Sequence, residues 1–443
     1  MPRRKKNAQD APIIKVVKKN DKLPSRLLGM KDFTYLEQAC FDLAYSRAFE
    51  LAGVYGFKSI KTPILESFDL YKKTLRRERD KEAYNVDCEK GEKAVLRPEL
   101  TQGMIRSYFE NNVEIENKVA RLFSFGPIFR REKLQSGCYR ESTQFDLEVI
   151  GTKKPMVDAL LIAIANKYFQ NMQVEVQLQI NSLGDALCRK EYCSKLSSFY
   201  KERGRKSKLC NGCKLSLPKN CLSLLDCTND SCAKLREEAP QIADFLSVDS
   251  RDHLTKTLEI LDELKISYNF NPYLVRGLNY YNDVVFEFWP INKDGSINTL
   301  ALAGGGRYDG LIENLGGPSM PASGLAIGIE RMISKIRDKS SLTNYREEDI
   351  VFIAQLGDQA KLKALQLSDE LLEAGYNIKQ SIITDSLREQ LEEAAQMKAK
   401  VCLIMGKKEI MDGTILMRDI DSGAQETVVF KKIKERLVKK MSA

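Results

Sequence analysis

The sequence is poor in histidine and has no long hydrophobic run. It contains a single histidine, His253, among 443 residues. Because imidazole is the side chain that most readily exchanges protons near neutral pH, this nearly excludes a histidine general base or a histidine-rich metal site. No apolar stretch approaches the ~18 residues of a spanning helix, which excludes a membrane protein. The first residues, MPRRKKNAQD, lack the apolar segment of a secretory signal. His253 falls near the start of a predicted helix, so we expect a surface or helix-capping residue.

Charged residues are unevenly distributed. Hydrophobic residues make up 43% of the chain and charged residues 30%, which is typical of a soluble globular protein. The length predicts two to four domains. Residues 1–22 carry a net charge of +6 and residues 431–443 of +5, out of +9 in total. We interpret residues 1–22 as a flexible basic arm. Either end could add salt-sensitive affinity for a polyanion or be a solvated, mobile terminus.

Eleven cysteines in a chain without an export signal indicate reduced thiols in a cytosolic protein. Five of them fall in one segment: Cys210, Cys213, Cys221, Cys227 and Cys232. The pairs Cys210-x2-Cys213 and Cys227-x4-Cys232 have spacings compatible with a four-thiolate zinc site, with Cys221 as the spare. The alternative is a cluster of reduced, partly buried thiols. A zinc ion here would be structural, because the candidate pocket residues lie elsewhere in the chain.

Hydrophobic periodicity indicates two different architectures in one chain. Residues 119–150 predict a long antiparallel hairpin whose second strand alternates apolar and polar residues, as a half-buried strand does. Residues 185–268, rich in cysteine and helical in pattern, look like an insertion. A polar linker is expected at 338–349. Strands then alternate with helices over residues 347–443, which predicts a separate small α/β domain.

The hairpin carries the first candidate chemistry. Because residues two apart on a strand share a face, Arg130 and Glu132 point the same way. On the return strand Gln144, Asp146 and Glu148 share a face, and antiparallel pairing could put Arg130 beside them. One cation among several acceptors could form a binding surface. The alternative is a solvated sheet face with cross-strand ion pairs.

Three other motifs are ambiguous when taken singly. The glycines of GGGRYDGL (304–311) allow close approach of a ligand or make a tight turn. In GLAIGIERM (324–332), Arg331 early in a helix suits a phosphate, or it is a surface arginine. In VRGLNYY (275–281), the arginine and tyrosines form either a polar pocket wall or an aromatic core.

Taken together and in order, these motifs resemble the histidyl-tRNA synthetases, a family of class II aminoacyl-tRNA synthetases. The resemblance spans residue 23 to the C-terminus and includes Pro63 at the place of the class II dimer-interface motif. The pair VRGLNYY and GGGRYDGL is specific to this family and its close relatives. The motifs are RPELTQG (97–103), GPIFRRE (126–132), YRESTQFDLEVIG (139–151), LVRGLNYYNDVVFEF (274–288), AGGGRYDGL (303–311), GLAIGIERM (324–332) and SLREQLEEAAQMKAKVCLIMG (386–406).

The resemblance implies an α+β fold. A class II antiparallel sheet flanked by helices would occupy residues 23–340, interrupted by the insertion at about 185–268, and residues 347–443 would form an α/β anticodon-binding domain. It also implies a cytoplasmic homodimeric ligase. The enzyme would activate L-histidine with ATP and Mg²⁺ to histidyl-adenylate and transfer it to the 3′ end of tRNA(His).

Residue by residue, the resemblance assigns the ATP site and the catalytic groups. Arg130 matches the residue that holds the α-phosphate, and Arg276 matches the family's extra arginine on the same phosphate. Arg331 matches the arginine of the γ-phosphate. These three would be the catalytic cations, and Glu132 would help to place the adenine end of ATP.

The histidine site follows in the same way. Glu99, Thr101 and Gln144 match residues that grip the α-ammonium, whereas Glu148 and Tyr281 match residues that hydrogen-bond the two imidazole nitrogens. The full histidine-binding set implied is Glu99, Thr101, Arg130, Gln144, Glu148, Arg276, Tyr280, Tyr281 and Gly305.

The chain departs from the family at four places. Leu100 stands where the family has glycine, and Cys138 where many members have arginine. Ser142–Thr143 replace an aromatic residue or histidine, and Asn279 replaces an aspartate. The change at Cys138 removes a phosphate contact, for which Arg131 or Lys133 could compensate.

Two other functions compete with an active synthetase. A non-catalytic paralogue, such as the regulatory subunit of ATP phosphoribosyltransferase, usually lacks the anticodon-binding domain that this chain has. A pure RNA-binding accessory protein predicts a degraded amino acid pocket, yet the matching pocket residues are present. A histidine-dependent ATP–pyrophosphate exchange assay separates these functions.

Overall fold

The computed structural model divides the chain into two compact units, residues 1–339 and 340–443. In the ranges that the structure describes, no helix is both long and apolar enough to span a membrane. The basic arm, Glu132, Lys133, Asn279 and the polar linker lie outside these ranges. The described residues are 24–72, 83–111, 119–131, 137–276, 280–336, 350–381 and 384–441.

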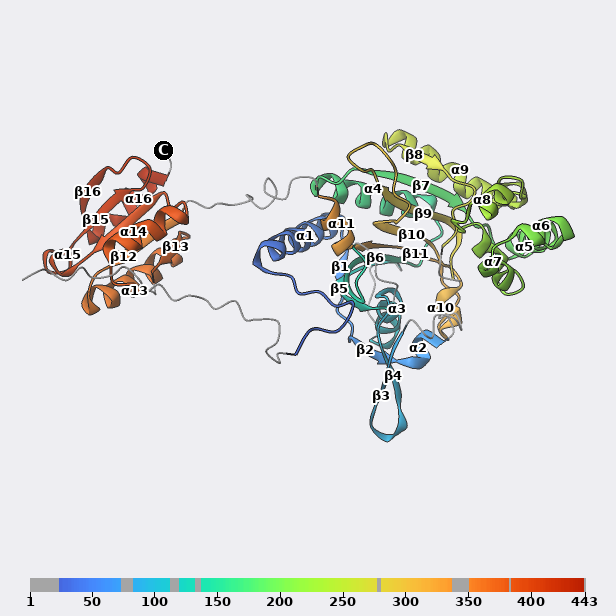
Figure 1. The fold of residues 1–443 in the computed structure, drawn as a ribbon, viewed down its shortest axis with the longest axis horizontal. Coiled ribbons are helices and arrows are strands. Elements are labelled where there is room, and N and C mark those ends of the chain that lie inside the picture. The colour runs from blue at the N-terminus through green and yellow to red at the C-terminus, as the bar shows by residue number, and fades with distance from the viewer. Residues whose placement is uncertain are drawn as a thin grey trace, which may run out of the picture. The chain divides into compact units, whose positions relative to one another are not determined.

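An eight-stranded sheet forms the centre of the first unit, in the order β1-β5-β6-β11-β10-β9-β7-β8 (Figure 1). The six central strands are antiparallel, and each edge strand pairs parallel with its neighbour. The strands are β1 (Lys58–Ser59), β5 (Ala120–Phe129), β6 (Glu141–Ile150), β7 (Val176–Ser182), β8 (Tyr268–Phe270), β9 (Asn282–Pro290), β10 (Ala303–Arg307) and β11 (Ala322–Gly328). This is the expected antiparallel sheet.

Helices cover one face of this sheet (Figure 1). They are α1 (Tyr35–Val54), α4 (Pro155–Asn171), α9 (Val248–Glu263) and α11 (Ile329–Lys335). Aromatic rings fill the layer between: the ring centroid of Phe145 on β6 lies 5.4 Å from that of Tyr168 on α4. Another such pair, Phe169 with Phe288 on β9, is also 5.4 Å apart.

The hairpin β5–β6 pairs as predicted, from Phe129 opposite Glu141 to Ala120 opposite Ile150. The expected half-solvated strand is wrong, because β6 is buried on both faces from Phe145 onward. On its second face, Glu148 accepts a hydrogen bond from Thr101 of α3 (Thr101–Glu110). Between β1 and β5 the chain also forms a three-stranded sheet of β2 (Leu65–Ser67), β4 (Lys93–Leu96) and β3 (Tyr84–Asp87), with α2 (Phe68–Lys72) and η1 (Glu89–Gly91).

The insertion is a small helical body with its own apolar side chains. Tyr192, Leu196 and Tyr200 of its first helix are almost completely buried, together with Leu224 and Leu235. The last helix of the predicted insertion range, α9, instead packs against α4 and belongs to the layer on the sheet. The elements are α5 (Ala186–Lys201), α6 (Arg203–Lys208), α7 (Asn211–Ser216), η3 (Cys221–Leu224), α8 (Asp230–Glu237) and η4 (Ile242–Phe245). A short α10 (Leu311–Asn314) follows β10.

The second unit is a five-stranded mixed sheet in the order β13-β12-β14-β15-β16. Alternate residues of its interior strand β12 face two layers: Val351 packs with residues of α13, and Phe352 with Ala394 of α14. Its strands are β12 (Ile350–Gln355), β13 (Asn377–Gln380), β14 (Val401–Met405), β15 (Thr414–Asp419) and β16 (Gln425–Val429). Its helices are α13 (Asp358–Glu373), α14 (Leu387–Gln396), α15 (Lys407–Asp412), η5 (Phe430–Lys432) and α16 (Ile433–Met441).

The basic C-terminal end is not a mobile tail over its described residues. Residues 433–441 form α16, and the side chains of Ile433 and Leu437 are buried in the core of the second unit. The Nζ of Lys440 lies 2.9 Å from Oδ2 of Asp419. The alternative of a solvated, mobile terminus is therefore wrong for this end.

Candidate active site

A cavity of about 980 Å³ opens on the sheet face opposite the helical layer. Gln144 and Asp146 of β6 line it, whereas Phe145 between them points to α4. Successive residues of a strand point to opposite faces, so the polar row of the hairpin forms the cavity floor. The predicted site residues that line the cavity are Glu99, Thr101, Arg130, Gln144, Arg276, Tyr280, Tyr281 and Arg331.

Two predicted residues are placed differently. Glu148 lies beneath the cavity with 1% of its surface exposed. Gly305 does not line the cavity. It is packed against its neighbours, since a Cβ at this position would overlap the carbonyl oxygen of Gly324 and the ring of Phe286. The neighbouring Gly304 lines the cavity instead, and a Cβ there would overlap the guanidinium of Arg276.

The floor of the cavity is a network of buried acceptors. The hydroxyl of Thr101 donates to Oε1 of Glu148 at 2.7 Å, and the hydroxyl of Tyr308 donates to Oε2. The hydroxyl of Tyr280 donates to Oε2 of Glu99 at 3.1 Å. Burial raises the pKa of Glu148 to about 8, although the hydrogen bonds from Thr101 and Tyr308 act to lower it. The alternative of a solvated sheet face is therefore wrong.

Three acceptor atoms on this floor have no partner among the described residues: Oε1 of Gln144 and both carboxylate oxygens of Asp146. Asp146 is fully buried, and burial raises its pKa well above the ordinary value, with further contributions from Glu148 and Glu99. Buried polar atoms are nearly always hydrogen-bonded in native proteins, so each such atom needs an explanation. Here the atoms line a cavity that a ligand with donor groups can enter.

The arginines are held at the cavity by acceptors from different segments of the chain. Arg276 donates to a carboxylate oxygen of Glu287, and its guanidinium lies 5.3 Å from the ring centroid of Tyr281. Burial acts to lower the pKa of Arg276, but Tyr281 and Glu287 outweigh it and raise the pKa. Nε of Arg130 donates to the carbonyl oxygen of Pro98 at 2.6 Å. Nη1 of Arg331 donates to the carbonyl oxygen of Ala301 at 3.3 Å.

Sequence reasoning missed several residues that position this site. Nε of the buried Arg97 donates to the carbonyl oxygen of Pro127 at 2.7 Å, and its Nη1 donates to that of Thr62 at 2.9 Å. These bonds fix the segment before α3 against β5. Glu330 accepts from the backbone N–H of Thr143 with both carboxylate oxygens, at 2.7 and 2.8 Å. The position of Arg97, two residues before Glu99 in the motif RPELTQG, could have indicated that it belongs to the site.

His253 is neither a surface residue nor a cap. Its Nε2 lies 2.6 Å from Oδ2 of Asp158, and 13% of its side chain is exposed. Asp158 also accepts from Nη2 of Arg307 at 3.0 Å and from the hydroxyl of Ser323 at 2.6 Å. Burial acts to raise the pKa of Asp158, but His253 and Arg307 outweigh it and lower the pKa. The network joins α4, α9, β10 and β11, a packing that periodicity cannot reveal.

Among the described residues, two of the departures from the family pattern lie at the cavity. Cys138 and Ser142 line the cavity, and Leu100 is completely buried beside α3. Arg131 does not line the cavity in the described part of the chain. Its guanidinium instead lies 4.8 Å from the ring centroid of Tyr84, and compensation by Arg131 stays a prediction.

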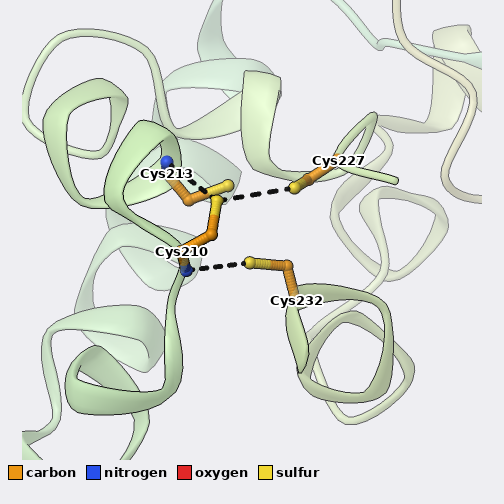
Figure 2. Close-up of side chains that lie close together, drawn as sticks. All are labelled: Cys210, Cys213, Cys227 and Cys232. Carbon is orange, nitrogen blue, oxygen red and sulfur yellow. Dashed lines mark hydrogen bonds between the residues drawn. The ribbon is translucent and has the colours of Figure 1, made fainter. Parts of the chain in front are cut away.

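The four paired cysteines of the insertion meet in space (Figure 2). Their sulfur atoms all lie within 4.8 Å of one another, and those of Cys210 and Cys227 are 3.9 Å apart. The backbone N–H of Cys210 donates to Sγ of Cys232 at 3.2 Å, and that of Cys213 to Sγ of Cys210 at 3.4 Å. Cys221 stays apart, with its Sγ 3.6 Å from the carbonyl oxygen of Cys193. Four thiolates in this arrangement can hold a tetrahedral metal ion.

Comparison with known proteins agrees with this geometry. A family model described as histidyl-tRNA synthetase matches residues 29–332, and one described as an anticodon binding domain matches residues 350–440. The histidine–tRNA ligase of Thermosipho melanesiensis is 36% identical over 85% of this chain and 89% of its own length.

Two solved structures share the fold. Apo histidyl-tRNA synthetase of Staphylococcus aureus aligns with a TM-score of 0.76 and 29% identity, covering 94% of this chain and 99% of that one. A Bacillus halodurans protein titled as an ATP phosphoribosyltransferase regulatory subunit/histidyl-tRNA synthetase aligns with a TM-score of 0.62 over 86% of this chain and 97% of its own, at only 17% identity, which shows the fold alone. From the extent of the family match and the identity to its relatives, we conclude that the chain belongs to the histidyl-tRNA synthetase family.

Proposed function

We propose that this protein is a histidine–tRNA ligase. It activates L-histidine with ATP, giving histidyl-adenylate and diphosphate, and transfers the histidyl group to the 3′ end of tRNA(His). The observation that carries this proposal is one cavity in which acceptors of Gln144 and Asp146, without a partner among the described residues, face the side chains of Arg130, Arg276 and Arg331. Such a cavity suits an amino acid and a nucleotide polyphosphate together.

The arginines would act on the phosphates of ATP. The carboxylate of histidine attacks the α-phosphorus in line, and negative charge builds on the phosphate oxygens. Fixed cations at these oxygens stabilise the transition state. We assign Arg130 and Arg276 to the α-phosphate and Arg331 to the γ-phosphate. Glu132 is proposed for the adenine end, and Mg²⁺ arrives with ATP as part of that substrate.

The buried acceptors would recognise histidine. Glu99, Thr101 and Gln144 are proposed for the α-ammonium, and the unpartnered oxygens of Asp146 make it a further acceptor. Glu148 and Tyr281 are proposed for the imidazole. Each carboxylate oxygen has two acceptor sites, so Glu148 can accept an imidazole N–H while keeping its bond from Thr101.

The competing functions fit the chain less well. A regulatory paralogue has no need of the second unit, which matches an anticodon binding domain. The likeness to the Bacillus halodurans protein does not favour a regulatory role, because at 17% identity it reports only the fold. An RNA-binding accessory protein would have no use for unpartnered acceptors beneath an arginine-lined cavity.

We further propose tRNA(His) as the macromolecular substrate, a homodimer as the working assembly and the cytoplasm as its location. Ile64 and Leu65, which directly follow Pro63, are 44% and 43% exposed, so apolar surface is available for a second copy. Outside the reaction itself, we propose one structural zinc ion on Cys210, Cys213, Cys227 and Cys232, because their four sulfur atoms converge.

Histidine-dependent ATP–pyrophosphate exchange tests the activity. We expect exchange with L-histidine and none with the other amino acids. Exchange that no amino acid stimulates, in protein that still binds tRNA, would replace the proposal with an accessory role. Stimulation of an ATP phosphoribosyltransferase without any exchange would favour the regulatory paralogue.

A further inference from the structure

One wall of the cavity is built by the insertion. The segment 225–228, together with Ala233 and Arg236 of α8, lines the same cavity as the predicted site arginines. Cys227 belongs to this wall and to the four-cysteine cluster at once. The cysteine cluster therefore reaches the pocket in space, although the cysteines lie far from the other pocket residues in sequence.

The wall is connected to the segment that carries Arg276. Nη1 of Arg236 donates to the carbonyl oxygen of Leu225 at 2.7 Å. The guanidinium of Arg236 also lies 4.9 Å from the ring centroid of Tyr273. Tyr273, Leu274 and Arg276 all line the cavity. A displacement of the wall would thus reach the residues proposed to hold histidine and the α-phosphate.

The four cysteines come from three segments: α7 with its N-cap, the wall itself, and α8. Cys210 caps α7 and Cys213 lies within that helix, Cys227 is in the wall, and Cys232 lies in α8 (Figure 2). A tetrahedron with Zn–S bonds of ~2.3 Å has sulfur–sulfur edges of about 3.8 Å. The observed 3.9 Å between Cys210 and Cys227, and the limit of 4.8 Å for all pairs, fit one metal ion. A single ion at this point would cross-link the wall to both helices.

We propose that the zinc ion on these four thiolates fixes the wall of the active-site cavity, so that occupancy of the metal site governs affinity for histidine. The identity of the affected ligand rests on the proposed function. Four sulfur ligands at tetrahedral spacing select zinc among common ions, with iron as the competitor. Zinc contributes no step to the reaction and acts only by positioning.

Elemental analysis and binding measurements on the full chain, purified without chelator, test this proposal. We expect about one zinc per chain in wild type, and loss of the zinc in Cys213→Ser and Cys232→Ser. The matched control is Cys221→Ser, a buried cysteine of the same insertion outside the cluster. It should keep its zinc. Isothermal calorimetry should give a Kd for L-histidine that is about tenfold weaker in the zinc-free variants, because small misplacements of positioning groups have large effects.

A second measurement covers variants that fail to fold. Zinc is removed from wild type with a chelator and a thiol-reactive mercurial, and is then restored with thiol and ZnCl₂. The affinity for L-histidine should fall when zinc is removed and recover when zinc is restored. Zinc content near zero, iron in its place, or equal histidine affinity with and without zinc would overturn the proposal. These outcomes are separate from failure of the proposed ligase function, because metal content and histidine binding are measured without exchange activity.

Discussion

Glu148 lies beneath the cavity with its carboxylate accepting from Thr101 and Tyr308. Its pKa is raised to about 8 by burial, so near neutral pH it is largely protonated in the free protein. Because the folded state binds this proton more tightly than the unfolded state, the contribution of Glu148 to stability is greatest below pH 4.5 and is lost as the pH rises toward 8. The form that accepts an imidazole N–H is the carboxylate.

We therefore expect kcat/KM for histidine to rise with pH through about 8. In Glu148→Gln this rise should disappear, and kcat/KM should fall, because an amide cannot become a carboxylate. The measurement is the pH profile of exchange for both proteins. Ionisations of free histidine are common to the two profiles, so their difference isolates Glu148. Superimposable profiles would show that Glu148 does not control this step.

Arg276 offers a direct test of the transition-state charge. Arg276→Ala should lower the exchange rate by ~10²–10³-fold, about 3–4 kcal/mol, as loss of one such fixed group typically does. The substitution also leaves Glu287 without its arginine. Glu287 keeps its hydrogen bond from Nε1 of Trp289 at 2.8 Å, but its charge is then uncompensated. The double variant Arg276→Ala/Glu287→Gln removes that charge, and thermal unfolding should then match wild type while exchange stays low. An alanine variant within tenfold of wild type would contradict the assigned role.

At the scale of single residues, sequence motifs predicted which polar groups would share a cavity. Glu99, Arg130 and Arg276 come from distant segments, yet all three line it. The motifs could not predict the partners of these groups. The hydroxyl of Tyr308, directly after β10, reaches Glu148 of β6 across β11, and that contact depends on the register of β10 and β11 against β6.

At the scale of elements, alternation predicted β6 correctly but not the environment of its polar face. An alternation of period two indicates only that the two faces of the strand differ in polarity. Thr101 of α3 lies on the polar face of β6, where it donates to Glu148. The same limit explains His253. Its helix α9 packs on α4, and the buried Asp158 thereby gains a partner that no local pattern indicates.

His253→Ala should therefore lower stability without changing the chemistry. Removing the imidazole takes one hydrogen bond from the fully buried Asp158, at a cost of about 1–3 kcal/mol. Urea unfolding at pH 7 measures the loss, and exchange kinetics at 25 °C should be unchanged. His253→Gln keeps a donor and should recover part of the stability. An alanine variant as stable as wild type would mean that Asp158 finds all its support in Arg307 and Ser323.

At the scale of the whole molecule, the polar segment 338–349 and the change of pattern after it indicated a second body, and the structure divides into two units at residue 339. The two basic ends differ in kind. The C-terminal charges sit on α16, whose buried face includes Ile433 and Leu437. Composition alone could not distinguish this helix from a tail, because the charges occupy its outer face.

Removal of residues 1–22 should weaken tRNA binding more than histidine activation. The segment carries a net charge of +6 and none of the site motifs, so its contribution should be electrostatic and should decline with added salt. Filter binding of tRNA from 50 to 300 mM KCl, for full-length and truncated protein, measures the effect. Replacement of residues 1–22 by a neutral Gly/Ser segment is the matched control for length. Equal affinity at low salt would leave the arm without this role.

The strand order of the central sheet bears on how the chain is made. Ile150 at the end of β6 pairs with Ala322 of β11, so this edge of the strand has no partner until the insertion and β7 to β10 have been synthesised. At typical translation speeds that interval is on the order of ten to thirty seconds. An apolar strand with an open edge can recruit other chains during such a delay. The edge of the nascent hairpin is therefore open to pairing with other chains until β11 arrives and closes the sheet.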